Sequence, residues 1–365
     1  MDSIDLENLK LETDAPRDLV YMESPQPEEE WLEPDWLGKR LTAPPDQVRS
    51  KKHRPDAICL YRVRNSLILP RSIVIDAKSG LIKQESAFRN NMSPTIFHGA
   101  LVKRNGTYSY KGKVGNSDVK EVPKPIYSLD TDWPGAFGHV FLDCLPRAWA
   151  VNRAPADVEL VSSAKHIKLL NEFLRLLRVK KRVRKLVTPV LAPEAYMADS
   201  SIDRKGWIHS AGFEMITRIK ETAKKRYEGS WSLPRRIYVS RARTSGRKLS
   251  NEPEVERIFE ASGFAIVHPE TIPLVEQIVL FMNATHVAGP GGSGMHMSLF
   301  CNSGCVVGVI SSPSWFFNAD IVCSQVTRIR LVHIVGMQTP EVHQRSQGDF
   351  FVDTADVKAF INRYC

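Results

Sequence analysis

The sequence predicts an α/β fold with two lobes built on parallel sheets, and three observations support this prediction. The 365 residues are enough for about two domains of ordinary size. Short apolar strands alternate with amphipathic helical stretches through most of the chain, which is the pattern of βαβ units. The pattern breaks at residues 228–234, where a long helical stretch gives way to Gly-Ser-Trp-Ser-Leu-Pro before a new strand begins.

The expected strands are runs of four or five residues rich in aliphatic and aromatic side chains, over residues 57–61, 72–76, 158–162, 236–240, 264–268, 286–289 and 306–310. Apolar residues at helical spacing predict helices over residues 165–178, 209–227, 254–262, 274–283 and 294–300, and a closing helix over 355–364. From residue 233 onward, the succession of strands, a basic loop, helices and a glycine loop is that of a Rossmann-like lobe.

These patterns divide the chain into four parts. Residues 1–54 are an acidic segment with little periodicity, which we expect to be mobile. Residues 55–232 form an N-terminal lobe, and residues 233–335 form the C-terminal Rossmann-like lobe. Residues 336–365 are a C-terminal extension that ends in the closing helix.

Charge is distributed unevenly. Residues 1–36 hold twelve acidic and two basic side chains, whereas the whole chain has a net charge of +9, so the body is strongly basic. Such a body attracts phosphate-bearing small molecules, an anionic membrane face or nucleic acid. The acidic segment is either a solvated leader or a shield against nonspecific anions.

The segment 165–185 holds nine basic residues and one acidic residue, interleaved with leucines at helical spacing. It predicts an amphipathic helix with a cationic outer face. That face either is simply solvated or holds the protein on an anionic membrane surface.

Composition argues against membrane-spanning and exported classes. The longest apolar runs have about five residues, whereas a spanning helix needs about twenty. The N-terminus lacks the basic start and the apolar stretch of a signal peptide. The six cysteines are scattered and never spaced as Cys-x-x-Cys, so we expect reduced thiols rather than disulfides or a zinc site. The expected location is the cytoplasm.

A glycine loop at 287–300 is the first motif that points to chemistry. Gly289, Gly291, Gly292 and Gly294 lie between a predicted strand and a predicted helix, where backbone N–H groups and the helix N-terminus can bind a phosphate. The run fits Gly-x-Gly-x-x-Gly, but the acidic residue that binds a ribose about 20 positions later in dinucleotide enzymes is missing. A nucleotide phosphate site is the favoured interpretation; a dinucleotide site and a purely structural turn are the alternatives.

A basic loop follows the strand at 236–240. It carries Ser240, Arg241, Arg243, Arg247 and Lys248 at the strand's C-terminal end, where open α/β sheets bind ligands. A guanidinium can hold two phosphate oxygens at once, so the loop predicts a diphosphate clamp, with an exposed solubilising loop as the alternative. Asn251 is the expected N-cap of the next helix.

The segment 135–151 places His139, Asp143 and Arg147 four residues apart, on one face if the segment is helical. A histidine or carboxylate there can take a proton from an attacking hydroxyl, whereas a surface ion-pair ladder is the alternative. Pro146 removes one helical hydrogen bond and makes the position of Arg147 less regular.

Asp130 and Asp132 form an Asp-x-Asp pair after an apolar segment. Two carboxylates at this spacing can hold a divalent ion against a diphosphate. This metal-dependent reading competes with the arginine clamp.

Taken together, these motifs resemble glycosyltransferase family 61, the capsular polysaccharide biosynthesis group of bacteria, over about residues 135–310. The family shows a strand ending in Ser-Arg, a further Arg, Asn-Glu, a Glu-Gln helix and a glycine loop. Its upstream motif is His-x-x-x-Asp/Glu followed by Pro-Arg. The counterparts here are His139, Asp143, Pro146, Arg147, Ser240, Arg241, Arg247, Asn251, Glu252, Glu276, Gln277 and Gly289–Gly292.

The resemblance implies a GT-B-like fold, in which two Rossmann-like lobes face a central cleft. It also implies inverting, metal-independent transfer of a sugar from a nucleotide-sugar donor to a hydroxyl of a polysaccharide or glycolipid acceptor, without a cofactor. Residues 55–232 would then be the acceptor side and residues 233–335 the donor side. Such an enzyme would make capsule or exopolysaccharide in the bacterial cytoplasm, peripherally at the inner face of the membrane, and would need no nucleic acid.

The same resemblance implies a role for each matching residue. Asp143 or His139 would be the base, and Arg147 would lie on the acceptor side. The diphosphate would be bound by Arg241 and Arg247 together with the loop residues Gly292, Ser293 and Gly294. The nucleoside or sugar would be bound by Ser240, Glu276 and Gln277.

The sequence departs from the family at three positions. Gly291 replaces the usual histidine, Met297 lies near a common asparagine, and Gly308 stands where many members carry a glutamate. Two alternatives from other classes therefore stay open: an NAD(P)-dependent oxidoreductase, and a noncatalytic module that binds anionic polymer through its basic surface.

Overall fold

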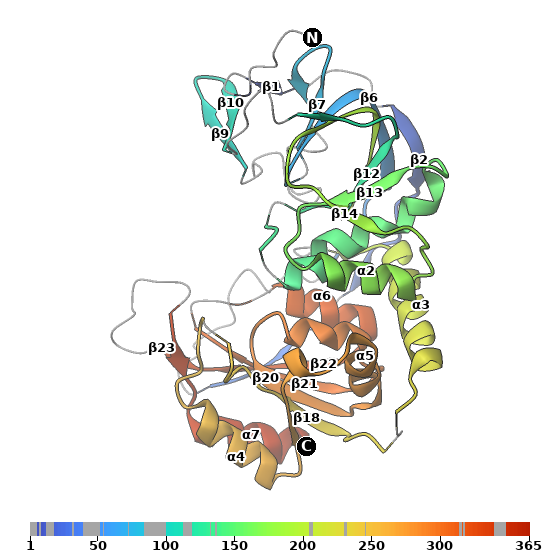
Figure 1. Ribbon diagram of the computed structural model, residues 1–365. Coiled ribbons are helices and arrows are strands. Elements are labelled where there is room, and N and C mark those ends of the chain that lie inside the picture. Colours follow the sequence, from blue (N-terminus) through green and yellow to red (C-terminus); the bar gives the residue numbers. More distant parts are fainter. Residues whose placement is uncertain are drawn as a thin grey trace. The chain divides into compact units, whose positions relative to one another are not determined.

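The protein is described by a computed structural model, and the description covers residues 6, 9–11, 18–30, 33–38, 52–53, 55–71, 73–83, 100–111, 119–131, 133–135, 137–203, 207–229, 232–244, 246–313, 316, 318–338 and 348–365. The chain divides into two compact units. The first contains residues 1–27, 54–203 and 208–215; the second contains residues 28–53, 204–207 and 216–365. Figure 1 shows the elements of both, coloured along the chain.

The first unit is built on a mixed sheet. Its strands follow the order β1-β8-β7-β6-β15-β12-β13-β14, with β2 also paired to β6 and β11 to β15. The bounds are Lys10–Leu11 (β1), Leu19–Glu23 (β2), Ile58–Leu69 (β6), Ile73–Asp76 (β7), Leu81–Ile82 (β8), Lys120–Glu121 (β11), Ile126–Ser128 (β12), Glu159–Ser162 (β13), Val183–Lys185 (β14) and Val190–Ala198 (β15).

This sheet is parallel only in part. The strands β12, β13 and β14 run parallel to one another, and β12 is parallel to β15. The longest strand, β6, is antiparallel to β2, β7 and β15. The parallel sheet predicted for this region is therefore present in part, and it is joined to an antiparallel part, because the short connection between β6 and β7 allows only antiparallel pairing.

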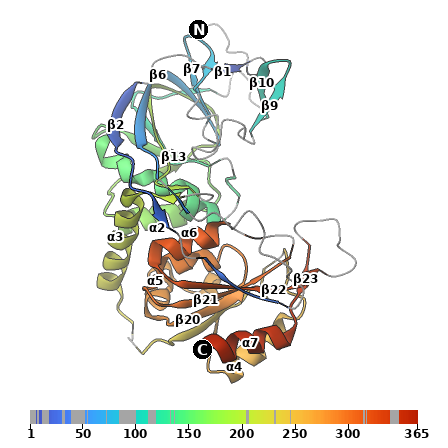
Figure 2. The same cartoon turned by 180° about the vertical axis from the view of Figure 1, so that it is seen from behind.

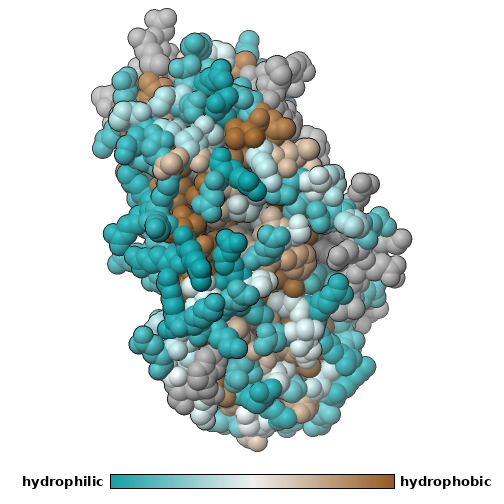
Figure 3. All heavy atoms as spheres, turned by 90° about the vertical axis from the view of Figure 1, so that its right-hand side faces the viewer, coloured by the Kyte–Doolittle hydropathy of each residue, from teal (hydrophilic) through white to brown (hydrophobic). Residues whose placement is uncertain are grey.

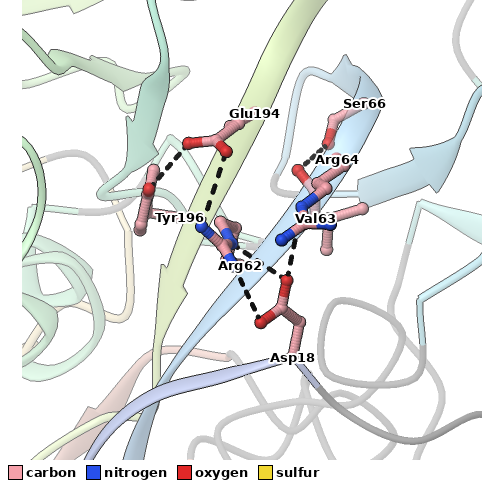
Figure 4. Close-up of polar contacts among 7 residues, drawn as sticks. All are labelled: Asp18, Arg62, Val63, Arg64, Ser66, Glu194 and Tyr196. Atoms are coloured by element: carbon pink, nitrogen blue, oxygen red, sulfur yellow. Dashed lines mark hydrogen bonds and ion pairs between the residues drawn. The ribbon is translucent and has the colours of Figure 1, made fainter.

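A polar network at the surface fixes the start of β2 on this sheet (Figure 4). The guanidinium of Arg62 donates from Nε and Nη2 to the two carboxylate oxygens of Asp18, at 2.9 and 3.2 Å. Its Nη1 lies 3.6 Å from Oε1 of Glu194, whose other oxygen accepts a 2.7 Å hydrogen bond from the hydroxyl of Tyr196. The hydrogen bond from Arg62 lowers the pKa of Asp18.

Short helices and hairpins complete the first unit. A π-helical turn (η3, Val140–Cys144) runs into a 3₁₀ segment (η4, Leu145–Arg153), and α2 covers Ile167–Leu176. The unit also contains β9 (Leu101–Arg104), β10 (Thr107–Tyr110) and β16 (Ile202–Asp203). The strand β17 (Trp207–Ile208) and the helix α3 (Ser210–Arg226) are divided between the two units, and most of α3 belongs to the second.

The second unit contains a six-stranded sheet in which every described pairing is parallel, in the order β19-β18-β20-β21-β22-β4. The bounds are Asp35–Leu37 (β4), Arg236–Val239 (β18), Ala265–Val267 (β19), His286–Pro290 (β20), Val306–Ser311 (β21) and Arg330–Val335 (β22). Apart from β4, the chain order is 2-1-3-4-5, as in doubly wound α/β sheets, so the Rossmann-like character expected here is supported. Short pairs also form between β3 (Glu29–Glu30) and β5 (Lys52–His53), and between β23 (Met337–Gln338) and β24 (Phe350–Phe351).

Helices cover both faces of this sheet (Figures 1 and 2). On one face, α4 (Glu252–Ala261) and α7 (Thr354–Tyr364) enclose a buried core that includes Tyr238, Phe259 and Phe360. On the other face lie α5 (Leu274–Asn283), α6 (Asn318–Thr327) and the 3₁₀ segments η5 (Pro269–Thr271) and η6 (Met295–Phe300). The helices expected over 274–283 and 355–364 are confirmed, whereas the one over 294–300 is a 3₁₀ helix.

The acidic segment 1–54, which we expected to be mobile, contributes strands to both main sheets. In the first unit β1 pairs with β8 and β2 with β6, and in the second unit β4 pairs with β22. The aromatic ring of Trp36 in β4 stacks on His333 at 4.6 Å. Apolar residues scattered among the acidic ones therefore suffice to anchor these pieces at sheet edges.

Two of several contacts show how the C-terminal extension packs on the rest of the second unit. The side chain of Asn251 exchanges hydrogen bonds with the backbone of Val352, at 2.9 and 3.2 Å. Asn251 is the N-cap residue of α4, as predicted, but its side chain makes no capping hydrogen bond to that helix and binds Val352 instead. The second contact is steric: a Cβ added at Gly308 would lie 2.6 Å from Cζ of Phe360, so α7 packs directly over β21 at this position.

Candidate active site

The sheet of the second unit reverses its strand order between β18 and β20. In doubly wound sheets the crevice beyond the carboxyl ends of two such strands is the usual ligand site. Here β18 ends at Val239 and leads into Ser240 and Arg241, while β20 ends at Pro290 and leads into the glycine loop. The two motifs that the sequence singled out therefore leave the same edge of the sheet side by side.

The guanidinium of Arg241 lies against this glycine loop. A Cβ added at Gly292 would lie only 2.0 Å from Nη1 of Arg241, so the position accepts no side chain while the arginine keeps its place. The Nη2 group of Arg241 donates a hydrogen bond to the carbonyl of Gly246 at 3.0 Å. Burial lowers the pKa of the Arg241 guanidinium. Its Nε is buried and makes no hydrogen bond within the described part of the chain.

Glu252 fixes the backbone at the start of this loop. Its Oε1 accepts a 2.7 Å hydrogen bond from the backbone N–H of Arg241 and a 3.4 Å one from the hydroxyl of Tyr238. The side chain is buried, and the resulting desolvation raises the pKa of its carboxyl. Glu252 thus acts on the position of Arg241 through the main chain, a task that its place in the sequence motif did not reveal.

Arg247 belongs to the same charged cluster. Its pKa is lowered to about 10, mainly by burial and also by the nearby charge of Arg241, while Asp320 acts in the opposite direction. Two guanidinium groups close together repel each other unless an anion lies nearby. The pair therefore forms a site suited to a diphosphate.

Asp320 and His296 complete the cluster, and sequence reasoning missed both. Asp320 lies in the first turn of α6 and is 3% exposed; its Oδ1 is 3.8 Å from Nε2 of His296 in η6. Burial raises the pKa of Asp320 to about 7, although the charge of Arg247 lowers it. The only sequence signal was a single acidic residue within the apolar run 319–323.

The other residues predicted for the donor side have different surroundings. Ser240 is buried, and its hydroxyl accepts a hydrogen bond from the backbone N–H of Ala242 at 3.2 Å. Ser293 and Gly294 are half-buried in the loop just before η6. Glu276 is exposed in the first turn of α5, whereas the amide of Gln277 is buried and donates to the carbonyls of Pro269 and Ile272 at 2.8 and 2.7 Å. Gln277 therefore holds the loop that precedes α5.

In the first unit, His139 and Asp143 form a hydrogen-bonded pair. The imidazole Nδ1 lies 2.5 Å from Oδ2 of Asp143, and the same oxygen accepts a 2.8 Å hydrogen bond from the hydroxyl of Thr131. Asp143 is fully buried, while the side chain of His139 is 19% exposed. Solvent or a substrate can thus reach the histidine but not the carboxylate.

The segment that carries this pair is not the single α-helix we expected. Asp143 lies in the π-helical turn η3, and Pro146 stands at the start of η4. Proline has no N–H for an α-helical bond, and π-helical turns occur frequently at functional sites. Arg147 donates from Nη1 to the carbonyl of Ala198, and its own carbonyl accepts a 2.6 Å hydrogen bond from Tyr127.

The side chain of Asp130 is held by hydrogen bonds from the protein itself. Its buried carboxylate accepts hydrogen bonds from the backbone N–H groups of Arg71 and Thr131, both at 2.9 Å, and from the hydroxyl of Ser163 at 2.8 Å. Burial raises the pKa of Asp130. Its predicted partner Asp132 lies outside the described residues. Within the described residues, no group of three or more His, Cys, Asp or Glu side chains is arranged to hold a metal ion.

A parallel α/β sheet with two arginines and a glycine loop at its switch point defines a class of proteins that bind phosphorylated ligands. Residues 137–308 match the family model Glycosyltransferase 61. This segment, a little under half of the chain, thus resembles a glycosyltransferase 61 domain, and the match supports an enzyme that transfers glycosyl groups from a sugar donor to an acceptor. The match includes the His139–Asp143 pair, Arg241, Arg247 and the glycine loop. No curated protein matches the chain.

Proposed function

We propose that the protein is an inverting, metal-independent glycosyltransferase of the GT-B type. It moves a sugar from a nucleotide-sugar donor to a hydroxyl of a polysaccharide or glycolipid acceptor, in the synthesis of bacterial capsule or exopolysaccharide. The observation that carries the proposal is the contact between the guanidinium of Arg241 and Gly292 at the switch point of the parallel sheet. It supports a nucleotide diphosphate as the ligand of this edge.

The donor's diphosphate lies, in this proposal, between the two guanidinium groups and the backbone of the glycine loop. Arg241 and Arg247 neutralise the charge that develops on the leaving diphosphate, and N–H groups at Gly292–Gly294 add to this. Their desolvated surroundings, which lower the pKa of both arginines, strengthen each such interaction.

His139 is the base in this proposal, and Asp143 positions it. The burial of Asp143 and its two hydrogen bonds leave the carboxylate no open side for an acceptor hydroxyl, whereas the imidazole is partly exposed. Because Nδ1–H donates to Asp143, the nitrogen that can take up a proton in this tautomer is Nε2.

The chemical step is a single displacement. The acceptor hydroxyl gives its proton to Nε2 of His139, and its oxygen forms a bond to the anomeric carbon of the donor sugar. The bond between that carbon and the diphosphate oxygen breaks, and the nucleoside diphosphate leaves with the electron pair. One displacement inverts the anomeric configuration.

A thermal-shift panel tests the proposal. We would measure the melting temperature with UDP, GDP, CMP, several nucleotide sugars and NAD(P), in EDTA and again with manganese, because a ligand of the folded state raises it. A shift with one nucleotide diphosphate in EDTA supports the proposal and identifies the donor class. A shift in melting temperature that requires manganese contradicts metal independence, and a shift with NAD(P) alone supports an oxidoreductase. No shift with any of the compounds supports a noncatalytic module.

We propose in addition that the enzyme meets its lipid-linked substrate peripherally, at the inner face of the membrane. No helix among the described residues is long and apolar enough to cross a bilayer, and Figure 3 shows one face of the molecule that is largely hydrophilic. Around α2 and β14 the exposed basic residues are Lys165, Lys168, Arg175, Arg178, Lys180, Arg182, Arg184 and Lys185.

Not every basic residue of this segment is available to lipid. The ammonium groups of Lys181 and Lys185 donate to backbone carbonyls of Val158 and Ala164, at 2.9 and 2.8 Å. Arg184 forms an ion pair with Glu159 at 3.5 Å. Each basic residue that reaches an anionic surface contributes about 1 kcal/mol. Sedimentation with vesicles of phosphatidylglycerol, compared with phosphatidylcholine, tests this part. We expect binding only to the anionic vesicles, and equal binding to both would contradict it.

A further inference from the structure

An exposed tryptophan lies next to the proposed base. Trp133 is 49% exposed, and among the described residues only four other large apolar side chains are as exposed as 38% or more: Leu19, Val20, Met22 and Val187. Trp133 is the one aromatic residue among the five. Exposing a large aromatic surface to water is unfavourable, so such a side chain at a reactive site is typical of ligand contact.

The geometry ties this tryptophan to the base. Its indole ring and the imidazole of His139 are nearly parallel, with an interplanar angle of 16° and ring centroids 6.3 Å apart. The backbone N–H of Trp133 donates to the hydroxyl oxygen of Thr131 at 3.2 Å. The same hydroxyl donates to Asp143, the partner of His139. One threonine thus binds both the backbone of Trp133 and the carboxylate that contacts the proposed base.

We propose that Trp133 is the binding platform for a pyranose ring of the acceptor, which it holds with a hydroxyl directed to Nε2 of His139. A pyranose has an apolar face of C–H groups and a rim of hydroxyls. The face packs on an aromatic ring, while the rim stays available for hydrogen bonds. The indole and imidazole planes are nearly parallel, so a sugar ring that packs on the indole lies parallel to the imidazole as well. The imidazole lone pair lies in the imidazole plane and can therefore accept a hydrogen bond from a hydroxyl on the rim of the sugar.

The inference rests on the proposed function and sharpens it, because it names the acceptor as a sugar rather than a peptide or lipid hydroxyl. Trp133 is well suited to binding a sugar ring, since the protein already covers about half of its surface and the other half is exposed. An indole has only two side-chain torsions to fix, so little conformational entropy is lost when a ligand binds.

Saturation-transfer NMR tests the proposal without knowledge of the natural acceptor. The probes are methyl glucopyranoside, methyl galactopyranoside and methyl N-acetylglucosaminide, with glycerol as a hydroxyl-bearing compound that has no ring face. We expect saturation of the ring C–H protons of at least one glycoside and none of glycerol. Trp133→Ala should weaken this binding by about three- to tenfold, and Trp133→Phe should retain most of it.

Val187→Ala is the matched control, because it removes another exposed apolar side chain of the same unit and should leave the glycoside signal unchanged. Each variant is also titrated with the nucleotide diphosphate found in the thermal-shift panel. If that nucleotide still binds while Trp133→Ala leaves the glycoside signal intact, the platform is wrong and the proposed function stands. If no nucleotide binds to the wild-type protein, the proposed function itself has failed. A glycoside signal that is equally weakened by Val187→Ala also overturns the platform.

Discussion

The Nδ1 atom of His139 lies 2.5 Å from Oδ2 of Asp143, with the carboxylate buried and the imidazole partly exposed. The i, i+4 spacing of the sequence predicted that the two residues would meet, but it could not say which was the base. The burial of Asp143 is the reason we propose His139 as the base, because a carboxylate enclosed by the fold is suited to orient its neighbour rather than to receive a substrate.

Replacement of either member of this pair should reduce turnover. We expect His139→Ala to lower kcat by about 10²- to 10⁴-fold, because the acceptor hydroxyl then loses its proton acceptor. Asp143→Asn should lower kcat to a similar degree, because the amide no longer favours the tautomer with a free Nε2. Initial rates at saturating donor measure both effects.

The control for this pair is His166→Ala, which removes a second, half-buried histidine of the same unit whose ring faces Phe137. It should leave kcat within about twofold of wild type, as surface changes away from the chemistry usually do. Near-normal turnover by His139→Ala would falsify the assignment of the base.

The contact between Arg241 and Gly292 can be tested by substitution of either residue. Arg241→Ala should abolish transfer without unfolding the protein, because the desolvated guanidinium contributes little to stability. Gly292→Ala keeps the charge but places a Cβ 2.0 Å from Nη1, so the guanidinium must move. We expect nucleotide diphosphate affinity to fall by about tenfold or more, as measured by calorimetry.

A matched glycine variant shows whether the added methyl group itself is harmful. A Cβ at Gly135 meets nothing within 4 Å, so Gly135→Ala should bind the nucleotide as the wild type does. If Gly292→Ala retains full affinity as well, the guanidinium does not hold the diphosphate.

Asp320 should make stability depend on pH. In the unfolded chain its carboxyl loses its proton near the ordinary pKa of 3.8, whereas burial keeps it protonated up to about 7 in the folded state. Between these pH values the folded state binds more protons, so this residue makes the free energy of unfolding fall as pH rises. Above about pH 7 the effect is constant.

Asp320→Asn removes this ionisation, so the melting temperature of the variant relative to wild type should rise between about pH 4 and 7 and level off above. Differential scanning calorimetry across this range measures the difference. A difference that does not vary with pH would show that Asp320 is ionised throughout.

Gly308 explains one departure from the family pattern. Phe360 of α7 fills the space above it, so a glutamate at 308 has no room here. We expect Gly308→Ala to lower the free energy of unfolding by about 1–3 kcal/mol through overpacking. Urea unfolding measures this, and Phe360→Leu in the same chain should recover part of the loss, since the two residues are in direct contact. Additive losses in the double variant would argue against that contact.

The fold was predictable where the pattern is local. The strands β18, β20 and β21 and the helices α4 and α5 have clear apolar periodicity, and the predicted ranges agree with the structure to within a few residues. The strand β15 was missed because Pro193 and Glu194 interrupt its apolar run. Its antiparallel pairing with β6 joins residues more than a hundred positions apart, and no local signal encodes such a choice.

The site residues, like the fold, were predictable only where the sequence signal is local. Arg241 and the glycine loop stood out because each is an unusual run of one residue type. Asp320 and Thr131 did not, because each is a single polar residue whose importance arises only when the fold brings distant segments together. The structural task of Gln277 was likewise hidden, since its two partners are backbone carbonyls.

The strand β4 gives the protein an unusual order of assembly. Residues 35–37 leave the ribosome early, but their partner β22 follows roughly 300 residues later. At about 5 to 20 residues per second, the early strand waits about 15 to 60 seconds for that partner. A fragment that starts at residue 233 retains the donor-side motifs but leaves the outer side of β22 unpaired, an open edge that favours aggregation. Expression of this donor-side fragment alone should therefore require residues 28–53 to be supplied on the same or a second chain.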